Sequence, residues 1–156
     1  MVSLLIEVVR EDWADPAVPL PDYATEGAAG ADLRANLPPE DRAAGLSLQP
    51  GRRVLVPTGL RVAIPEGHEM QIRPRSGLAL KHGIGIPNAP GTIDSDYRGP
   101  LGVILINLGG EEFLIAHGAR IAQAVVAPVL RARFTLTGTL DATVRGTGGF
   151  GSTGVS

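Results

Sequence analysis

The sequence predicts an all-β domain, a jelly-roll-like β-barrel or sandwich with one short helix. Its 156 residues include 21 glycines and 13 prolines, which interrupt the chain too often for helices of ordinary length. Between them, short segments rich in aliphatic and β-branched residues recur at a spacing of roughly 8 to 12 residues, which is typical of sandwiches and jelly rolls. A chain of this length is most simply one domain with its own core.

The expected strands follow from local patterns of apolar and polar residues. The N-terminal run MVSLLIEVVR predicts a first strand, because Glu7 interrupts it and no basic or cleavable leader pattern accompanies it. Three segments alternate apolar and polar residues and predict half-exposed strands: residues 52–60, 60–67 and 68–74. Two segments are more continuously apolar and predict buried strands: residues 101–109 and 120–130.

Two segments depart from this strand pattern. The segment RSGLALKHG, residues 75–83, predicts a short helix with Ser76 as N-cap and Gly83 as terminator. The first turn of that helix would offer backbone N–H groups beside Arg75, an arrangement suited to an anion. Residues 37–51 predict a polar loop with at most one helical turn.

Composition excludes several classes of function. The chain carries 14 basic and 16 acidic side chains, so it has no basic footprint for a nucleic-acid backbone. It has no cysteine, which removes disulfides, thiolate nucleophiles and cysteine-based zinc sites. No apolar run approaches the ~18 residues of a membrane span. We therefore expect a cytoplasmic protein that binds neither nucleic acid nor membrane.

Three aspartates are candidates for acid–base or metal chemistry. Asp32 lies in AGADLRA among small residues and predicts either a Mg²⁺ contact, direct or through water, or a turn or cap aspartate. Asp94 and Asp96 lie in GTIDSDYRG. Asp94 and Tyr97 would face opposite ways on a continuous strand, so a shared site requires the chain to turn there, for example as a hairpin. The histidines lack metal-ligand spacing and are expected to pack or face solvent: His68, His82 and His117.

Other segments carry groups that suit a phosphate. PRSGLA supplies Arg75, Ser76 and a helix start within a few residues, although a solvated surface arginine is the simpler alternative. GARIAQ places Gln123 in an otherwise apolar strand, where it could also be a satisfied core amide. The glycine-rich tail RGTGGFGSTG contains Arg145 and Phe150. It indicates either a disordered terminus or a tail whose backbone wraps a phosphate.

Together, AGADLRA, PRSGLA, GTIDSDYRG, GARIAQ and RGTGGFGSTG resemble, in this order, the five motifs of the trimeric dUTP diphosphatases (dUTPases). The resemblance covers residues 29–154. It implies a jelly-roll homotrimer with an exchanged C-terminal arm, comprising a β domain at residues 1–144 and a flexible arm at residues 145–156. It also implies hydrolysis of dUTP to dUMP and pyrophosphate, which supplies dUMP for dTMP synthesis and keeps uracil out of DNA.

The resemblance also implies roles for individual residues. Asp94 would activate the water that attacks the α-phosphorus, and Asp32 would steady, through water, a Mg²⁺ ion bound by the triphosphate. Tyr97 would pack against the deoxyribose and exclude a 2′-hydroxyl, and Phe150 would stack on uracil. The substrate-binding residues implied are Arg75, Ser76, Gly77, Asn88, Thr92, Ile93, Asp94, Tyr97, Gly102, Gln123, Arg145, Phe150, Gly151, Ser152 and Thr153. Asp96 is treated as structural.

Two other functions remain open on this sequence. The related dCTP deaminases share the fold but need a glutamate in the corresponding chemistry, whereas PRSGLA and TIDSDY follow the diphosphatase pattern. A non-catalytic deoxynucleotide-binding regulator on the same scaffold would not require Asp32, Asp94, Tyr97 and the complete tail. We therefore expect a Mg²⁺-dependent dUTP hydrolase.

Overall fold

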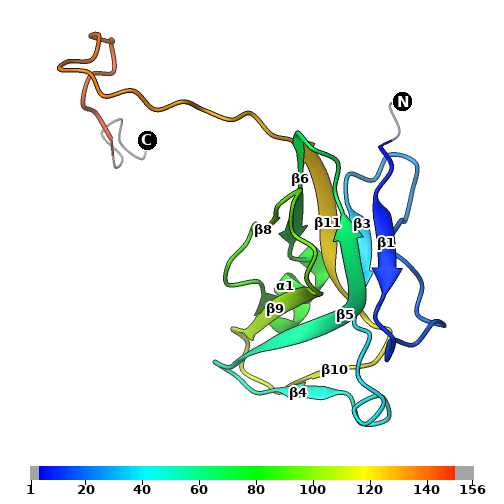
Figure 1. Cartoon of the computed structure of the whole chain (residues 1–156). Coiled ribbons are helices and arrows are strands. Elements are labelled where there is room, and N and C mark those ends of the chain that lie inside the picture. The colour runs from blue at the N-terminus through cyan, green and yellow to red at the C-terminus, as the bar shows by residue number, and fades with distance from the viewer. Residues whose placement is uncertain (1–3, 150–156) are drawn as a thin grey trace.

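The computed structural model describes residues 4–149 and shows an all-β sandwich with one short helix. A four-stranded sheet has the order β1-β5-β9-β7, and a five-stranded sheet has the order β2-β3-β11-β6-β8. A two-stranded sheet of β10 and β4 closes one end (Figure 1). The pairings within the described residues do not close a barrel, so the sandwich form of the predicted jelly-roll-like fold is confirmed.

The elements are short, as the spacing of glycine and proline predicts. The first sheet contains β5 (Arg53–Ala63), the longest strand, with β1 (Glu7–Arg10), β7 (Ile84–Gly85) and β9 (Leu101–Asn107). The second contains β2 (Asp22–Tyr23), β3 (Ala31–Arg34), β6 (His68–Arg73), β8 (Gly91–Ile93) and β11 (Arg120–Pro128). The third contains β4 (Leu46–Leu48) and β10 (Phe113–Ile115), and the helix is α1 (Ser76–His82).

The core lies between the two larger sheets. Both contribute buried aliphatic side chains, for example Val56 and Leu105 from the four-stranded sheet and Leu33, Ile72 and Ile121 from the five-stranded sheet. Burial of such side chains is the main favourable term in folding. The alternation of buried and half-buried positions along β3 and β9 follows directly from the two-residue period of a strand.

Three local expectations differ from the structure. The predicted runs at residues 52–60 and 60–67 form one strand, β5, because its first part pairs with β9 and Leu60–Ala63 pair with β1, across a register irregularity between Pro57 and Leu60. The loop expected at residues 37–51 contains β4, whose pairing with β10 is a tertiary contact that local propensity does not report. Neither strand predicted to be buried is uniformly so: β9 is apolar on both faces but alternates in burial, and β11 is fully buried at three of its nine residues.

A polar cluster fastens the N-terminal segment to the sandwich. His117 accepts the N–H of Leu37 at Nδ1 (3.0 Å), so its Nε2 carries the proton and donates to Asp15 (3.1 Å). The backbone N–H of Ala17, followed by the His117 side chain, holds the pKa of Asp15 below its ordinary value of 3.8. Asn36 is buried and adds hydrogen bonds to both backbone groups of Asp15.

Because the pKa of Asp15 is lowered on folding, its stabilising effect is present above the unfolded pKa and is lost as the pH falls through the folded pKa. We expect Asp15→Asn to unfold at lower urea concentration than the unmodified chain at neutral pH. That gap should narrow as the pH falls through and below 3.8, the ordinary pKa of the carboxyl group. Fluorescence of Trp13, the single tryptophan, reports the transition. Exposed Asp12 supplies the control Asp12→Asn, and a gap for Asp15→Asn that is independent of pH would contradict the assignment.

Candidate active site

The chain turns immediately after Asp94, as a shared site for Asp94 and Tyr97 requires. The N–H of Tyr97 donates to the carbonyl of Asp94 (3.2 Å), which closes a four-residue turn. The segment is not a hairpin, because β8 pairs with β6 in one sheet while β9 pairs with β5 in the other. The turn therefore carries the chain from the five-stranded to the four-stranded sheet.

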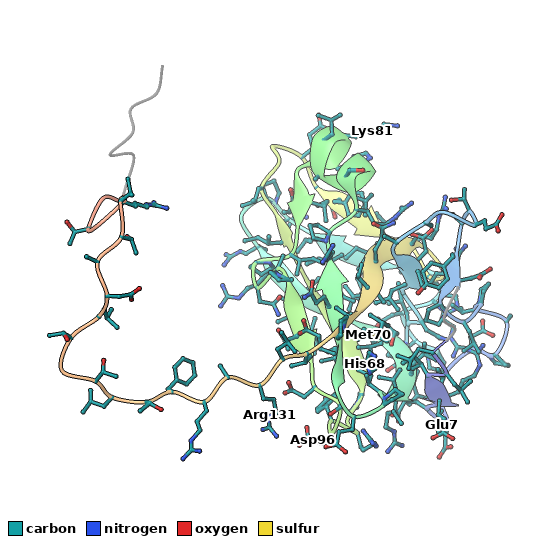
Figure 2. All side chains as sticks on the ribbon, turned by 90° about the horizontal axis from the view of Figure 1, so that it is seen from above. Glu7, His68, Met70, Lys81, Asp96 and Arg131 are labelled. Carbon is teal, nitrogen blue, oxygen red and sulfur yellow. The ribbon has the colours of Figure 1, made fainter. Side chains whose placement is uncertain are left out.

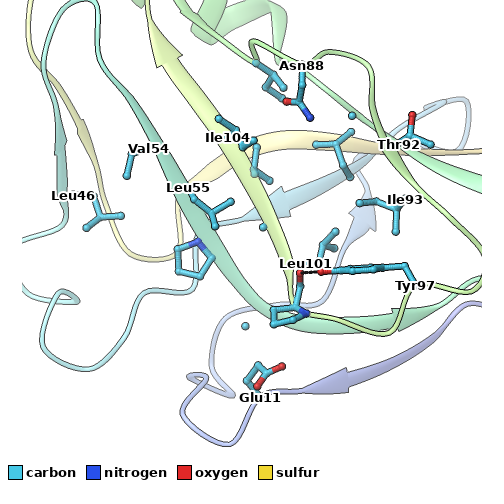
Figure 3. Close-up of a pocket in the computed structure, with 18 of the residues that line it drawn as sticks. Glu11, Leu46, Val54, Leu55, Asn88, Thr92, Ile93, Tyr97, Leu101 and Ile104 are labelled. Atoms are coloured by element: carbon cyan, nitrogen blue, oxygen red, sulfur yellow. Dashed lines mark hydrogen bonds between the residues drawn. The ribbon is translucent and has the colours of Figure 1, made fainter.

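A cavity of about 640 Å³ opens beside this turn. Its lining is mostly aliphatic, including Leu55 and Ile104 from the outward face of β5 and β9 (Figure 3). This explains why β9 is apolar on both faces: one faces the core and the other faces the cavity. The predicted site residues that line the cavity are Asn88, Thr92, Ile93, Asp94, Tyr97 and Gly102.

Close packing shapes two parts of this cavity. A Cβ added at Gly102 would lie 2.7 Å from a methyl group of Leu55, and one at Gly91 would lie 3.3 Å from the Asn88 side-chain nitrogen. Side chains at these two glycines would therefore narrow the space in front of β8. Strand β8 is an edge strand of its sheet, so one side of its backbone is not paired with a neighbouring strand.

A second group of predicted residues gathers on the outer face of the five-stranded sheet. Asp32 lies between two guanidinium groups, with Arg75 Nε 3.2 Å from Oδ1 and Arg120 Nη1 3.2 Å from Oδ2. Gln123 on β11 is paired directly opposite Asp32 on β3. We call Asp32, Arg75, Arg120 and Gln123 the guanidinium cluster. With two cations and one carboxylate, it carries a net positive charge.

One oxygen of Asp32 is left without a donor. The Oδ1 contact with Arg75 is an ion pair without hydrogen-bond geometry, so this buried atom lacks a hydrogen-bond donor among the described residues. The Asp32 side chain is only 12% exposed. A buried acceptor in this state is suited to a water molecule or to the hydrated shell of a cation.

The start of helix α1 adjoins this cluster. The N-cap is Arg75, which makes no side-chain capping bond, so the assignment of Ser76 as N-cap is wrong by one residue and Ser76 is the first helical residue. The first bond within the helix runs from the N–H of Ala79 to the carbonyl of Arg75. The amides of Ser76 and Gly77 precede it and have no partner within the helix. Gly83 ends the helix in the left-handed conformation, as expected.

Within one chain, the five motif segments named in the sequence analysis do not come together at a single place. None of Asp32, Arg75, Ser76, Gly77 and Gln123 lines the cavity. Beyond Pro128 the chain runs away from the sandwich (Figures 1 and 2). Within residues 4–149, the hydrogen bonds of exposed Arg145 are with Gly148 alone. The predicted tail residues Phe150, Gly151, Ser152 and Thr153 lie outside the described residues.

Two site residues were not identified from the sequence. Arg120 contacts Asp32, and its position within GARIAQ was the available signal, since that segment also contains the candidate Gln123. Glu11 lines the cavity and pairs with Arg61 (2.7 Å), and nothing in its local sequence marks it.

The histidines take no part in either group. His117 bonds Asp15, the ring of His82 lies 5.1 Å from that of Phe113, and His68 is close to the carbonyl of Glu66. Among residues 4–149 no set of three or more histidine or acidic side chains is placed to hold a metal ion. In the same range no helix is long and apolar enough to cross a membrane.

Comparisons with known proteins agree with this geometry. The deoxyuridine 5'-triphosphate nucleotidohydrolase of Dinoroseobacter shibae is 69% identical over 153 residues, covering 98% of this chain and 99% of that protein. The dUTPase of Staphylococcus bacteriophage 80alpha, solved with dUpNHpp, is 25% identical with a TM-score of 0.78, covering 97% of this chain and 99% of that one.

A mutant dUTPase of phage phi11 of S. aureus, whose structure describes the coordination of a structural Mg(II) ion, shares the fold. Its TM-score is 0.73 at 20% identity, covering 88% of this chain and 99% of that one. A family model for dUTPase matches residues 17–154 of the present sequence. With a match over that range and a relative of such high identity over nearly its whole length, the chain belongs to the dUTPase family.

Proposed function

We propose that this chain hydrolyses dUTP to dUMP and pyrophosphate. The observation that carries the proposal is the cavity itself, whose lining includes Asn88, Thr92, Ile93, Asp94 and Tyr97. A flat base, through its faces, and a sugar fit such a lining, and a carboxylate beside them suits activation of water. The names of the relatives and the family support the same activity.

The uracil ring would be recognised largely through backbone groups. Because β8 (Gly91–Ile93) is an edge strand, its unpaired N–H and C=O groups can bond the polar edge of the base, in the way that an edge strand accepts a further strand. Asn88 would contact the base and sugar, and Gly102 would leave room for the ring. The ring of Tyr97 would lie against the deoxyribose and occupy the space that a 2′-hydroxyl needs.

Asp94 would act as the general base. Asp94 is exposed, follows β8 directly and is one of the residues that line the cavity, which supports this role. It would take a proton from a water molecule whose oxygen attacks the α-phosphorus. A bond forms between that oxygen and phosphorus, the bond from the α-phosphorus to the bridging oxygen breaks, and pyrophosphate leaves. Phosphoryl transfer depends mostly on such alignment and on neutralisation of charge.

The guanidinium cluster and the start of α1 would hold the triphosphate. Arg75, Ser76, Gly77 and Gln123 supply donors for phosphate oxygens, and the net positive charge favours an anion. The orphaned Oδ1 of Asp32 fits a Mg²⁺ ion held through water, because that oxygen still needs a donor. When bound, Mg²⁺ would neutralise charge on the phosphates as pyrophosphate departs. Asp32 would accept hydrogen bonds from the hydrated ion and keep Arg75 in place.

A complete site would need more than one chain. The cavity and the guanidinium cluster share no residue, and the tail leaves the sandwich, so we infer a homotrimer in which sites form between subunits. The extended segment after β11 supports this, since an isolated chain gains nothing from a row of solvent-exposed apolar side chains. Those side chains are Leu130, Phe134, Leu136, Leu140 and Val144.

The C-terminal arm, residues 145–156, would then close over the site of a neighbouring subunit. Arg145, Gly151, Ser152 and Thr153 would contact the phosphates, and Phe150 would stack on the uracil. Ordering of such an arm excludes water and completes the set of catalytic contacts. Release of pyrophosphate from dUTP, but neither from dCTP nor from UTP, is the experiment that separates this function from a deaminase and from a non-catalytic binding protein.

Asp94→Asn keeps the shape of the side chain and removes its basicity. The rate of pyrophosphate release should fall by roughly 10² to 10⁴, the usual range for loss of a general base, while a non-hydrolysable dUTP analogue still binds. Asp96 lies exposed in the same turn, so Asp96→Asn is the matched control and should stay active. Turnover by Asp94→Asn above half the normal rate would rule Asp94 out as the base.

Tyr97→Ala should weaken dUTP binding and bring the kcat/KM values for dUTP and UTP closer together, because it opens space for the 2′-hydroxyl. Steady-state hydrolysis of both nucleotides measures that ratio. Tyr23 is exposed on β2 and does not line the cavity, so Tyr23→Ala is the control and should leave the ratio as it was. If the ratio is also unchanged in Tyr97→Ala, discrimination between the sugars resides elsewhere.

The arm and the shared site can be tested with two inactive variants. A chain cut after Val144 should fold and assemble but lose nearly all activity, and Asp94→Asn should be nearly inactive as well. When the two are refolded together, a site that takes its base from one chain and its arm from another can be rebuilt. Random mixing in equal amounts gives a working base and a working arm to about a quarter of the sites, which is the ceiling on recovered activity.

Mixing the two folded variants without refolding is the control and should recover little activity. Mixed trimers are verified by mass before assay. A site built within one chain predicts no recovery under either protocol, since every chain then lacks an essential part. Inactive mixed trimers would therefore contradict a site shared between subunits, while the fold would stand.

A further inference from the structure

The ring of Tyr97 is folded back over the loop that carries it. Its hydroxyl donates to the carbonyl of Pro100 (3.0 Å), and Figure 3 shows the ring lying along the wall of the cavity with this bond drawn. The hydroxyl is therefore engaged, and the ring presents its face and edge to the cavity. The Tyr97 ring is thus held at two points: by its covalent bond to Cβ, and by the hydrogen bond from its hydroxyl to Pro100, three residues later.

The backbone under the ring is braced by Arg98. Its Nη1 donates to the carbonyls of Ser95 (2.7 Å) and Tyr97 (2.8 Å), which ties together two carbonyls of the turn. The N–H of Tyr97 closes the same turn onto Asp94. Because these bonds fix the loop backbone, the orientation of the ring depends on the size of the side chain at residue 99, which lies between Tyr97 and Pro100.

That space is the position where Gly99 lacks a side chain. A Cβ built on Gly99 would overlap the Tyr97 hydroxyl oxygen and lie 2.5 Å from Cζ and 2.9 Å from Cε2. Real Cβ atoms do not approach other atoms this closely. Gly99 is not among the glycines with positive φ, so its φ does not itself require glycine. The requirement for glycine thus comes from the tyrosine ring and not from the chain conformation.

We propose that Gly99 is a positioning residue for selectivity at the 2′ position of the sugar. Because Gly99 has no side chain, the Tyr97 ring can pack against residues 99–100 and keep its hydrogen bond to Pro100. The inference rests on the proposed role of Tyr97 beside the deoxyribose. A methyl group at residue 99 displaces the ring and breaks its bond to Pro100. Tyr97 is 43% exposed, so its ring has solvent to move into, and displacement of the ring opens the space that excludes ribose.

The test is Gly99→Ala in the full-length chain, assayed with dUTP and UTP. We expect the ratio of kcat/KM for dUTP to that for UTP to fall about tenfold, a change within the range that one hydroxyl contributes in a binding pocket. The kcat for dUTP should change far less, because Asp94 and its turn remain in place. A ratio measured on one preparation does not depend on the active fraction, so partial loss of folding cannot imitate this result.

Two further variants make the test specific. Gly110 is exposed, has nothing within 4 Å of an added Cβ and no positive φ, so Gly110→Ala is the matched control and should keep the ratio. Tyr97→Ala removes the whole ring that the new methyl group overlaps. Gly99→Ala should therefore leave the ratio nearly unchanged in the Tyr97→Ala background, a coupling that independent sites do not show.

The outcomes separate this inference from the proposed function. If the unmodified chain hydrolyses dUTP and Tyr97→Ala narrows the ratio while Gly99→Ala leaves it unchanged, the inference about Gly99 is wrong and the function stands. Equal losses on dUTP and UTP in Gly99→Ala would also overturn it. If Tyr97→Ala leaves the ratio unchanged, the role of Tyr97 falls together with that of Gly99. A chain without dUTP hydrolysis would instead refute the proposed function.

Discussion

The register of strand β11 is the constraint on which the rest of the site depends. This strand lies between β3 and β6, and its Gln123 is opposite Asp32 on one side and Arg73 on the other. Its inward residues Ile121 and Ala124 are buried in the core. A slip of one residue would exchange the two faces and bury Gln123 in place of aliphatic groups, so the hydrophobic core itself fixes the polar row on the outer face.

A similar link between core and site operates at the other sheet. Strand β9 buries Val103 and Leu105 on one face and presents Ile104 to the cavity on the other. The turn that begins at Asp94 carries the chain from β8 to β9, and thus from one sheet to the other. The position of its side chains is consequently determined by how the two sheets pack. A change in core packing would therefore shift side chains that line the cavity.

The positive charge relevant to binding is concentrated at one place and is not a property of the whole chain. The formal net charge is −2, which gives no general attraction for a polyanion. Yet Arg75 and Arg120 converge on the single carboxylate of Asp32 and leave one small region positive. Such a region suits one compact anion, in agreement with the proposed triphosphate. The carboxylate also compensates part of the repulsion between the two arginines, so both can stay in place before that anion binds.

The sequence by itself determined the all-β class and the short helix with its end at Gly83. It also indicated a turn of the chain after Asp94. Glycine, proline and apolar periodicity act locally, so these features can be predicted from local patterns. The family resemblance supplied the roles of the site residues, which stay predictions. Only the tertiary structure decided that β4 pairs with β10, that Arg120 joins Asp32, and that Glu11 lines the cavity. It also corrected the N-cap from Ser76 to Arg75. These features depend on contacts between segments far apart in the chain, and no local pattern records which distant partner a residue will meet.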